Sequence, residues 1–137
     1  MTRPFLLDTC AAIWFMDGAL SKNPLDALTD AHNRGLSTYV SPITALEVGN
    51  LARKGRFISS LAPSRWFELL MRAPGMSLAQ MPPQVLIASS ELPELRINDP
   101  ADRIIAATAR EYGFAVVTRD RALLDYGKRG YLNVLEC

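Results

Sequence analysis

Short apolar runs alternate with longer amphipathic stretches along this chain. Five of the apolar runs have the length and the aromatic and aliphatic composition of β-strands. They cover residues 5–7, 36–40, 76–81, 114–118 and 131–135. Runs this apolar are typical of strands in a parallel sheet, which is buried on both faces.

Most of the stretches between these runs open at a proline and carry apolar residues at helical spacing. They cover residues 24–33, 42–54, 63–72, 82–90 and 100–112. Shorter helices are expected from Thr9 and after Asp120, and Gly113 suits a left-handed cap after residue 112. The alternation predicts the α/β class, with three α/β/α layers around a central parallel sheet of four to five strands.

The chain has 137 residues, 49% of them hydrophobic, which suits one packed domain over residues 1–137. Fifteen basic and 14 acidic side chains give a net charge of +1, so a nucleic-acid site would have to be local. No run approaches the roughly 20 apolar residues of a membrane span. The first seven residues lack the apolar run of a signal peptide, and Cys10 and Cys137 lack metal-ligand spacing. A cytoplasmic protein without membrane contact is expected.

Two aspartates stand just after predicted strands. Asp8 closes the first run, and Asp120 follows the run at 114–118. The carboxyl ends of parallel strands face the crevice in which ligands bind, so both residues are candidates for one site. Each could instead serve only as the N-cap of the helix that follows it.

A glutamate falls within the apolar stripe of the helix expected at 42–54. Glu47 shares one side of the helical wheel with Ile43, Leu46, Asn50 and Leu51. A buried carboxylate needs a cation or strong hydrogen bonds as compensation. The alternative is a glutamate at the edge of the stripe that reaches solvent or an arginine.

The helix expected at 100–112 begins with two acids of different character. Asp99 precedes Pro100 and is explained by capping alone. Asp102 stacks above Ala106 and Ala109, on the side expected to be buried. An acid in the first turn also suits the helix dipole, which is the structural alternative for Asp102.

Asp8, Glu47, Asp102 and Asp120 would repel one another if they met without a cation. An all-oxygen ligand set favours hard ions, so Mg²⁺ is expected, with Mn²⁺ as a second possibility. Such ions support hydrolysis of phosphodiester bonds. The chain's one histidine, His32, lies far from the acids in sequence and is expected at the surface.

Two hydroxyls and several basic residues are candidates for supporting roles. Thr9 and Thr118 adjoin the acids and could hold a ligand carboxylate, or serve only in packing and capping. Residues that could contact a phosphate backbone are Arg53, Lys54, Arg56, Arg119, Arg121, Lys128 and Arg129. Basic residues of this kind can equally form a solvated face.

Four segments together resemble the PIN domain, and more narrowly the VapC toxins of bacterial toxin–antitoxin pairs. The segments are Leu6-Leu7-Asp8-Thr9, Ser41 through Glu47-Val48-Gly49-Asn50-Leu51, Asp99-Pro100-Ala101-Asp102-Arg103 and Val117-Thr118-Arg119-Asp120. The match spans nearly the whole chain in the right order. Related sequences often carry a histidine where Cys10 stands, and another where Ile97 and Asn98 stand.

The resemblance implies a PIN-like fold and a specific activity. The family's metal-binding acids fall on Asp8, Glu47, Asp102 and Asp120, with Asp99 as an accessory. The implied enzyme is a Mg²⁺-dependent endoribonuclease that cuts tRNA, rRNA or mRNA, stops translation and is neutralised by a VapB-type antitoxin. Family members commonly form homodimers.

Two other functions are compatible with the same residues. A phosphoryl-transfer enzyme with Asp8 as nucleophile would want a second aspartate at position 10, where Cys10 stands. A catalytically silent PIN-fold module that binds proteins is the non-enzymatic alternative. Five apolar residues are candidates for a dimer or antitoxin surface, with the core as the expected place for most of them. They are Trp14, Phe15, Trp66, Phe67 and Leu70.

Overall fold

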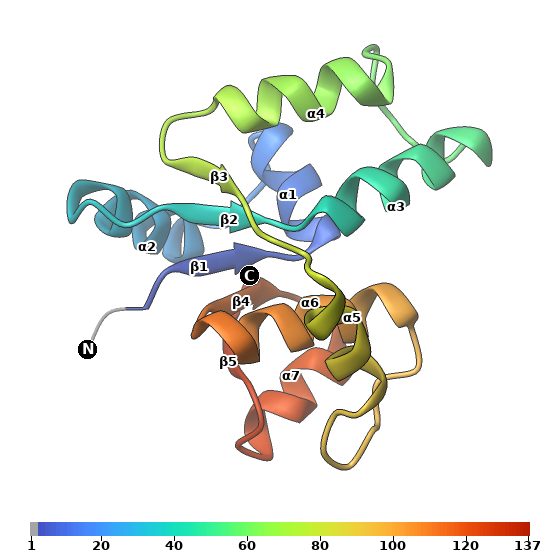
Figure 1. The fold of residues 1–137 in the computed structure, drawn as a ribbon. Helices are drawn as coiled ribbons and strands as arrows, with labels where there is room; N and C mark the ends of the chain where they lie inside the picture. Colours follow the sequence, from blue (N-terminus) through green and yellow to red (C-terminus); the bar gives the residue numbers. More distant parts are fainter. Residues whose placement is uncertain (1–2) are drawn as a thin grey trace.

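A computed structural model describes residues 3–137 and is built around a five-stranded parallel sheet (Figure 1). Its strands are β1 (Phe5–Leu7), β2 (Thr38–Val40), β3 (Met76–Leu78), β4 (Ala115–Thr118) and β5 (Asn133–Glu136). They lie side by side in the order β3-β2-β1-β4-β5, and every neighbouring pair is parallel. All five predicted strands are present, and the predicted parallel sheet is confirmed.

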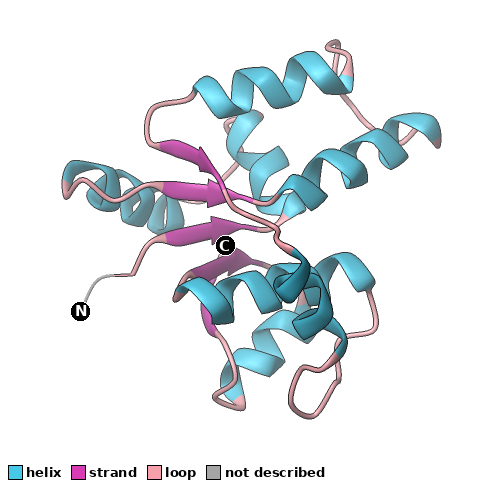
Figure 2. Ribbon diagram, viewed as in Figure 1, coloured by secondary structure: helices cyan, strands magenta, loops and turns pink. Residues whose placement is uncertain are grey.

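Seven helices connect and cover the strands (Figure 2). They are α1 (Thr9–Met16), α2 (Lys22–Asn33), α3 (Pro42–Arg53), α4 (Pro63–Arg72), α5 (Pro83–Ser90), α6 (Pro100–Tyr112) and α7 (Arg121–Lys128). A proline occupies the first turn of α3 to α6, where its missing N–H costs no hydrogen bond. Gly113 ends α6 with a φ of 74°, so the predicted left-handed cap is confirmed.

The edges of several elements differ by one to three residues from the sequence prediction. The strand expected at 36–40 begins at Thr38, because the Leu36 amide donates to the Ala31 carbonyl and completes the turn after α2. The strand expected at 76–81 ends at Leu78, shortly before the two prolines that open α5. Local hydrogen bonds of this kind leave no trace in the hydrophobic pattern.

The sheet has a core on each face, which makes three layers. Leu6 and Val116 point to the face covered by α5, α6 and α7, whereas Leu7 and Val117 point to the face covered by α1, α2 and α4. All four side chains are fully buried. The three-layer α/β/α prediction is therefore confirmed.

The five apolar residues singled out in the sequence belong to the core on the face of the sheet that carries Leu7 and Val117. Trp66 and Leu70 are buried there, and Trp14, Phe15 and Phe67 pack against it while remaining partly accessible. Core packing is thus the fate of the first two. The other three retain some surface, which leaves room for the interface prediction.

The path of the chain creates a switch in strand order at the carboxyl edge of the sheet, a region named the crevice. From central β1 the chain moves outward to β2 and β3, then returns to β4 on the other side of β1 (Figure 1). Ligands bind at such a switch in strand order. Helices α1, α3 and α7 begin there, directly after β1, β2 and β4. Helix α6 also begins at this edge, because its far end leads through Gly113 into the start of β4.

Candidate active site

Asp8 is held rigidly at the switch between β1 and β4. It is the N-cap of α1, where its Oδ1 accepts from the Ala11 N–H at 2.8 Å. Its Oδ2 accepts from the Thr118 hydroxyl at the end of β4, at 2.5 Å. With 5% of its surface exposed, Asp8 is close to buried. Asp8 therefore caps α1, and the same carboxylate also bridges the ends of β1 and β4.

Glu47 reaches the start of α1 from the second turn of α3. Its Oε1 accepts a hydrogen bond from the hydroxyl of Thr9, the first residue of α1. The Thr9 hydroxyl also lies 3.1 Å from the hydroxyl of Thr44, one turn before Glu47 on α3. Thr9 directly follows Asp8, and its hydroxyl thus binds the Glu47 carboxylate beside Asp8. This contact gives the predicted supporting role of Thr9 a structural basis.

The remaining acids stand at the N-terminal ends of α6 and α7. Asp99 caps α6 by accepting from the Ala101 N–H at 3.2 Å, and Asp102 follows in the first turn. Asp120 caps α7 by accepting from the Leu123 N–H at 3.0 Å. The Thr118 hydroxyl accepts from the Asp120 N–H at 2.9 Å while donating to Asp8. Thr118 therefore links Asp8 to the backbone of Asp120.

The pKa shifts show that the acids act on one another electrostatically. Burial, followed by the charges of Asp99, Asp120, Glu47 and Asp8, raises the pKa of Asp102 to about 8. Each of the four charges disfavours ionisation of Asp102. Four segments remote in sequence thus place their carboxyl groups within one electrostatic neighbourhood.

The pKa values of Asp8 and Glu47 are raised as well. Burial is the main cause for Asp8, opposed by its hydrogen bonds from Thr118 and Ala11, with a smaller upward contribution from Asp120. Burial also raises the pKa of Glu47, opposed by the hydrogen bond from Thr9 and reinforced by Asp99 and Asp8. Both carboxylates are costly to keep charged without a cation.

The same negative charges also raise the pKa of Cys10, the second residue of α1. Desolvation by the surrounding chain, together with the charges of Asp8, Glu47, Asp102 and Asp120, raises the pKa of its thiol to about 11. The cysteine itself is exposed. It follows that the four predicted acids all lie around the start of α1.

No lysine or arginine neutralises this cluster within residues 3–137. The ion pairs of that part of the chain involve Asp30, Glu68, Glu94 and Asp125, and none involves the acids of the crevice. Arg103, next to Asp102, turns away and donates to the Ile97 carbonyl. No ion pair within residues 3–137 therefore compensates the negative charge of the crevice.

The donor set of the crevice suits a hard divalent cation. Carboxylate and hydroxyl oxygens are the ligands of Mg²⁺ and Mn²⁺, and these ions neutralise clustered carboxylates. Over the described residues, no three His, Cys, Asp or Glu side chains are drawn together tightly enough to hold a metal as they stand. Asp8, Asp99 and Asp120 accept from backbone N–H groups, and Asp8 and Glu47 also accept from threonine hydroxyls.

The helical wheel of α3 was wrong in one respect. Leu46, expected in the buried stripe, is 58% exposed, and Asn50 is exposed too. The buried residues of α3 are Ile43, Thr44 and Val48. The helix is rotated toward Thr44 because it packs against α1, α4 and α6, and these contacts are not encoded in the sequence of α3 alone.

Thr44 is the residue that the sequence analysis missed. Its side chain is fully buried beside Thr9. The available signal was its spacing of three residues from Glu47, which places both side chains on the same side of a helix.

Basic side chains flank the crevice on the side of α7. The Arg119 guanidinium lies 4.1 Å from the centroid of the Trp14 ring, and its Nε donates to the Cys137 carbonyl at 2.9 Å. Arg119, Arg121 and Lys128, together with Asp125 and Glu136, help to line a hollow of about 740 Å³ between α7 and β5. Arg129 is instead paired with Asp125 at 3.0 Å, so the phosphate role considered for it loses support.

The other basic candidates lie farther along α3, where Arg53, Lys54 and Arg56 are exposed at its end. His32 is exposed on α2, as expected. Over residues 3–137, no helix combines the length and the apolar character needed to cross a membrane.

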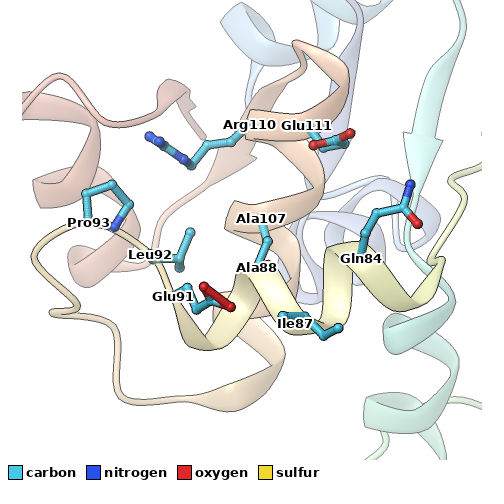
Figure 3. Close-up of a pocket in the computed structure, with 9 residues that line it drawn as sticks. All are labelled: Gln84, Ile87, Ala88, Glu91, Leu92, Pro93, Ala107, Arg110 and Glu111. Carbon is cyan, nitrogen blue, oxygen red and sulfur yellow. The ribbon is translucent and has the colours of Figure 1, made fainter.

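A second hollow, of about 500 Å³, lies between α5 and α6 (Figure 3). Gln84 and Ile87 line it from α5, Glu91 from just after α5, and Arg110 and Glu111 from α6. None of the acids of the crevice is among the residues that line it. The hollow is therefore separate from the candidate site.

The architecture and the order of the acids can be compared with known proteins. The family model of the PIN domain matches residues 5–129, a span that includes every acid of the crevice. The chain belongs to the PIN-domain family. Ribonuclease VapC22 of Mycobacterium tuberculosis is 31% identical to this PIN-domain chain over 118 residues, which are 86% of this chain and 88% of the relative.

Chains of two solved structures share the fold over nearly the full length. One is the VapBC2 complex of Rickettsia felis bound to a DNA fragment from its promoter, with a TM-score of 0.71 and 14% identity over 96% of this chain and 97% of that one. Another is the DNA-bound VapBC complex of Salmonella typhimurium, with a TM-score of 0.68 and 20% identity over 98% of both chains. At these identities the likeness establishes the fold.

Proposed function

We propose that this protein is a metal-dependent endoribonuclease of the VapC kind, formed by one PIN domain over residues 1–137. It cuts cellular RNA (tRNA, rRNA or mRNA), inhibits translation and is neutralised by a VapB-type antitoxin. Mg²⁺ is the proposed cofactor, and Mn²⁺ is a substitute. The family and the VapC ribonuclease relative support this proposal.

One observation carries the proposal more than any other. Asp8, Glu47, Asp102 and Asp120 surround one crevice at the switch of strand order, and no cationic side chain within residues 3–137 pairs with them. A structural ion-pair network would show arginine or lysine partners. Uncompensated carboxylates at a ligand-binding edge instead fit a metal site.

The residues divide the work of this site. Asp8, Glu47, Asp102 and Asp120 hold the cation, with Asp99 as a possible accessory at the start of α6. When bound, the cation supplies a Lewis acid that activates water and neutralises the charge developing on the phosphate. Thr118 fixes both Asp8 and the backbone of Asp120, and Thr9 fixes Glu47. Asp8 accepts two hydrogen bonds, which suits a rigid ligand better than an attacking nucleophile.

The RNA backbone is proposed to lie along the basic side of the crevice. Arg119 and Arg121 lie directly before and after Asp120, and Lys128 extends the same hollow. Trp14 and the Cys137 carbonyl fix the Arg119 guanidinium. Arg53 and Lys54 at the end of α3 extend the path farther from the acids. Such contacts give affinity without choice of sequence.

The partners and compartment follow from the kind of protein that is proposed. Two of the structures that share the fold are complexes of VapB with VapC, so a VapB-type antitoxin is the proposed protein partner. A homodimer that acts in the cytoplasm completes the proposal. The partly accessible Trp14, Phe15 and Phe67 are candidates for a protein interface.

The proposal is tested by incubating purified, antitoxin-free protein with structured RNA and Mg²⁺. Wild-type protein is expected to cut the RNA internally and to stop when EDTA is added. Asp8→Asn should lower the rate by about 100-fold or more. Asp30→Asn is the matched control, because Asp30 is exposed on α2 and pairs with Arg34. Cleavage that survives EDTA or Asp8→Asn, or a wild-type protein without activity, would overturn the proposal.

A further inference from the structure

A chain of hydroxyl groups runs from the interior of the protein to Glu47. Thr44, on α3, is 0% exposed, and its hydroxyl lies 3.1 Å from that of Thr9. Thr9, the first residue of α1, is 7% exposed and donates to Glu47 Oε1. The chain thus begins at a fully buried residue and ends at a carboxylate of the crevice.

The direction of this chain follows from counting protons. A threonine hydroxyl has one proton to donate and two lone pairs that accept. The proton of Thr9 is donated to Glu47, so Thr9 must accept in its contact with Thr44. Thr44 is therefore the donor. Within residues 3–137, Thr9 is the one hydrogen-bond partner of the Thr44 hydroxyl.

The chain of hydroxyl groups opposes two effects that would displace the Glu47 side chain. The charges of Asp99 and Asp8 repel the Glu47 carboxylate, and its half-buried position leaves a path to solvent. A glutamate side chain has several rotatable bonds, so it can turn toward solvent. A donor that is itself polarised by a second hydroxyl forms a stronger hydrogen bond than an isolated one. The pair of threonines therefore keeps Glu47 at the start of α1, next to Asp8.

Packing alone does not explain a threonine at position 44. A fully buried hydroxyl loses its hydrogen bonds to water, whereas valine fills nearly the same volume without that cost. An apolar core would favour valine here. The Thr44 hydroxyl is retained in a place where its partner is Thr9, the residue that holds Glu47.

We propose that Thr44 is a positioning residue that orients Glu47 through Thr9 and thereby sets the affinity of the crevice for a divalent cation. The inference rests on the proposed function, because it takes Glu47 to be a ligand of that cation. It adds a residue that touches neither cation nor RNA. Removal of such an outer partner typically weakens metal binding by about 10- to 100-fold.

The test is a titration of the RNA-free protein with Mn²⁺, in which the electron paramagnetic resonance signal of free Mn²⁺ gives the Kd. Thr44→Val should raise the Kd by about 10-fold or more. Thr44→Ser keeps the hydroxyl and should recover affinity to within about threefold of wild type. Thr29→Val on α2 is the matched control, because the Thr29 hydroxyl donates to the Leu25 carbonyl outside the crevice. Raising the Mn²⁺ concentration should restore much of the RNA cleavage by Thr44→Val.

A double-mutant cycle shows whether Thr44 acts through Glu47. In a Glu47→Gln background, the further change Thr44→Val should raise the Kd much less than it does in the wild-type protein. If Thr44→Val does not fold, Thr44→Ala is measured by the same criteria. An unchanged Kd overturns the proposal, and so does a Kd raised equally by the valine and serine variants.

The same titration separates this inference from the proposed function. If wild-type protein binds Mn²⁺ and Asp8→Asn does not, but Thr44→Val binds like wild type, the role of Thr44 alone is overturned. If wild-type protein binds no Mn²⁺, or Asp8→Asn binds it equally well, the proposed metal site is overturned, and the role of Thr44 with it.

Discussion

At the scale of single residues, the acids of the crevice combine a structural and a proposed chemical role. Asp8, Asp99 and Asp120 are each the N-cap of a helix, and the cap fixes where the carboxylate stands. The sequence presented capping and cation binding as alternatives. Capping does not exclude cation binding, because a capping carboxylate at the end of a β-strand stands at the edge of the sheet where ligands bind.

The double role of Asp8 predicts that two substitutions at this position differ in their effect on stability. Asparagine caps a helix about as well as aspartate and keeps an acceptor for Ala11 or Thr118. The free energy of unfolding of Asp8→Asn should therefore lie within about 1 kcal/mol of the wild-type value. Asp8→Ala loses the cap and leaves the proton of the buried Thr118 hydroxyl without its acceptor, at a cost of about 2–3 kcal/mol. Urea denaturation measures both variants. Equal losses in the two variants would contradict the account.

The raised pKa of Asp102 predicts how stability depends on pH. A carboxyl whose pKa is raised on folding contributes stability at pH values below its unfolded pKa of 3.8, and this contribution is lost as the pH rises through about 8. Metal-free wild-type protein should therefore lose stability between pH 5 and pH 8 relative to Asp102→Asn. Thermal unfolding of the two proteins at both pH values checks this. A constant difference between them would show that the pKa of Asp102 is not raised.

At the scale of elements, most of the fold could be predicted, and the reason is local. Prolines mark the starts of α3 to α6, and the apolar runs mark the strands, because both signals act within a few residues. The buried face of α3 could not be predicted, and Leu46 was misplaced. That face is set by contacts with α1, α4 and α6, which belong to other parts of the chain.

Two helical glycines give an element-scale prediction. A Cβ at Gly127 on α7 would lie 2.6 Å from Val134 Cγ2 on β5, whereas a Cβ at Gly49 on α3 would meet nothing within 4 Å. Gly127→Ala should therefore lower the free energy of unfolding by about 1–3 kcal/mol. Gly49→Ala should raise it by up to about 1 kcal/mol, through helix propensity. Chemical denaturation of the pair checks the packing of α7 on β5. A neutral Gly127→Ala would mean that α7 and β5 are not packed this closely.

At the scale of the whole molecule, the candidate site depends on topology more than on any one motif. The order β3-β2-β1-β4-β5 puts the ends of β1 and β4 side by side, and with them Asp8 and Asp120. The sequence supplied the four acids and, through family resemblance, their grouping. It could not supply the contact of Thr44 with Thr9, which is 35 residues away and becomes its neighbour only in the folded chain.

The basic side of the molecule predicts how RNA binding responds to salt. Arg121→Gln and Lys128→Gln, each in an Asp8→Asn background that does not cleave, should weaken binding to unrelated RNAs alike. Each should also reduce the slope of log affinity against log salt by about 0.7 to 1. Arg34→Gln is the control, since Arg34 pairs with Asp30 at the end of α2. Unchanged slopes would place the RNA elsewhere.

The most direct test of the central claim is paramagnetic broadening of the amide NMR signals by Mn²⁺. Substoichiometric Mn²⁺ should weaken the amide signals of Asp8, Glu47, Asp102 and Asp120 together, at one ion concentration, and spare those of α2. In Asp8→Asn, the same amount of Mn²⁺ should no longer weaken these four signals. Broadening that is centred on another part of the molecule, or that reaches the four acids at separate concentrations, would contradict a shared cation site.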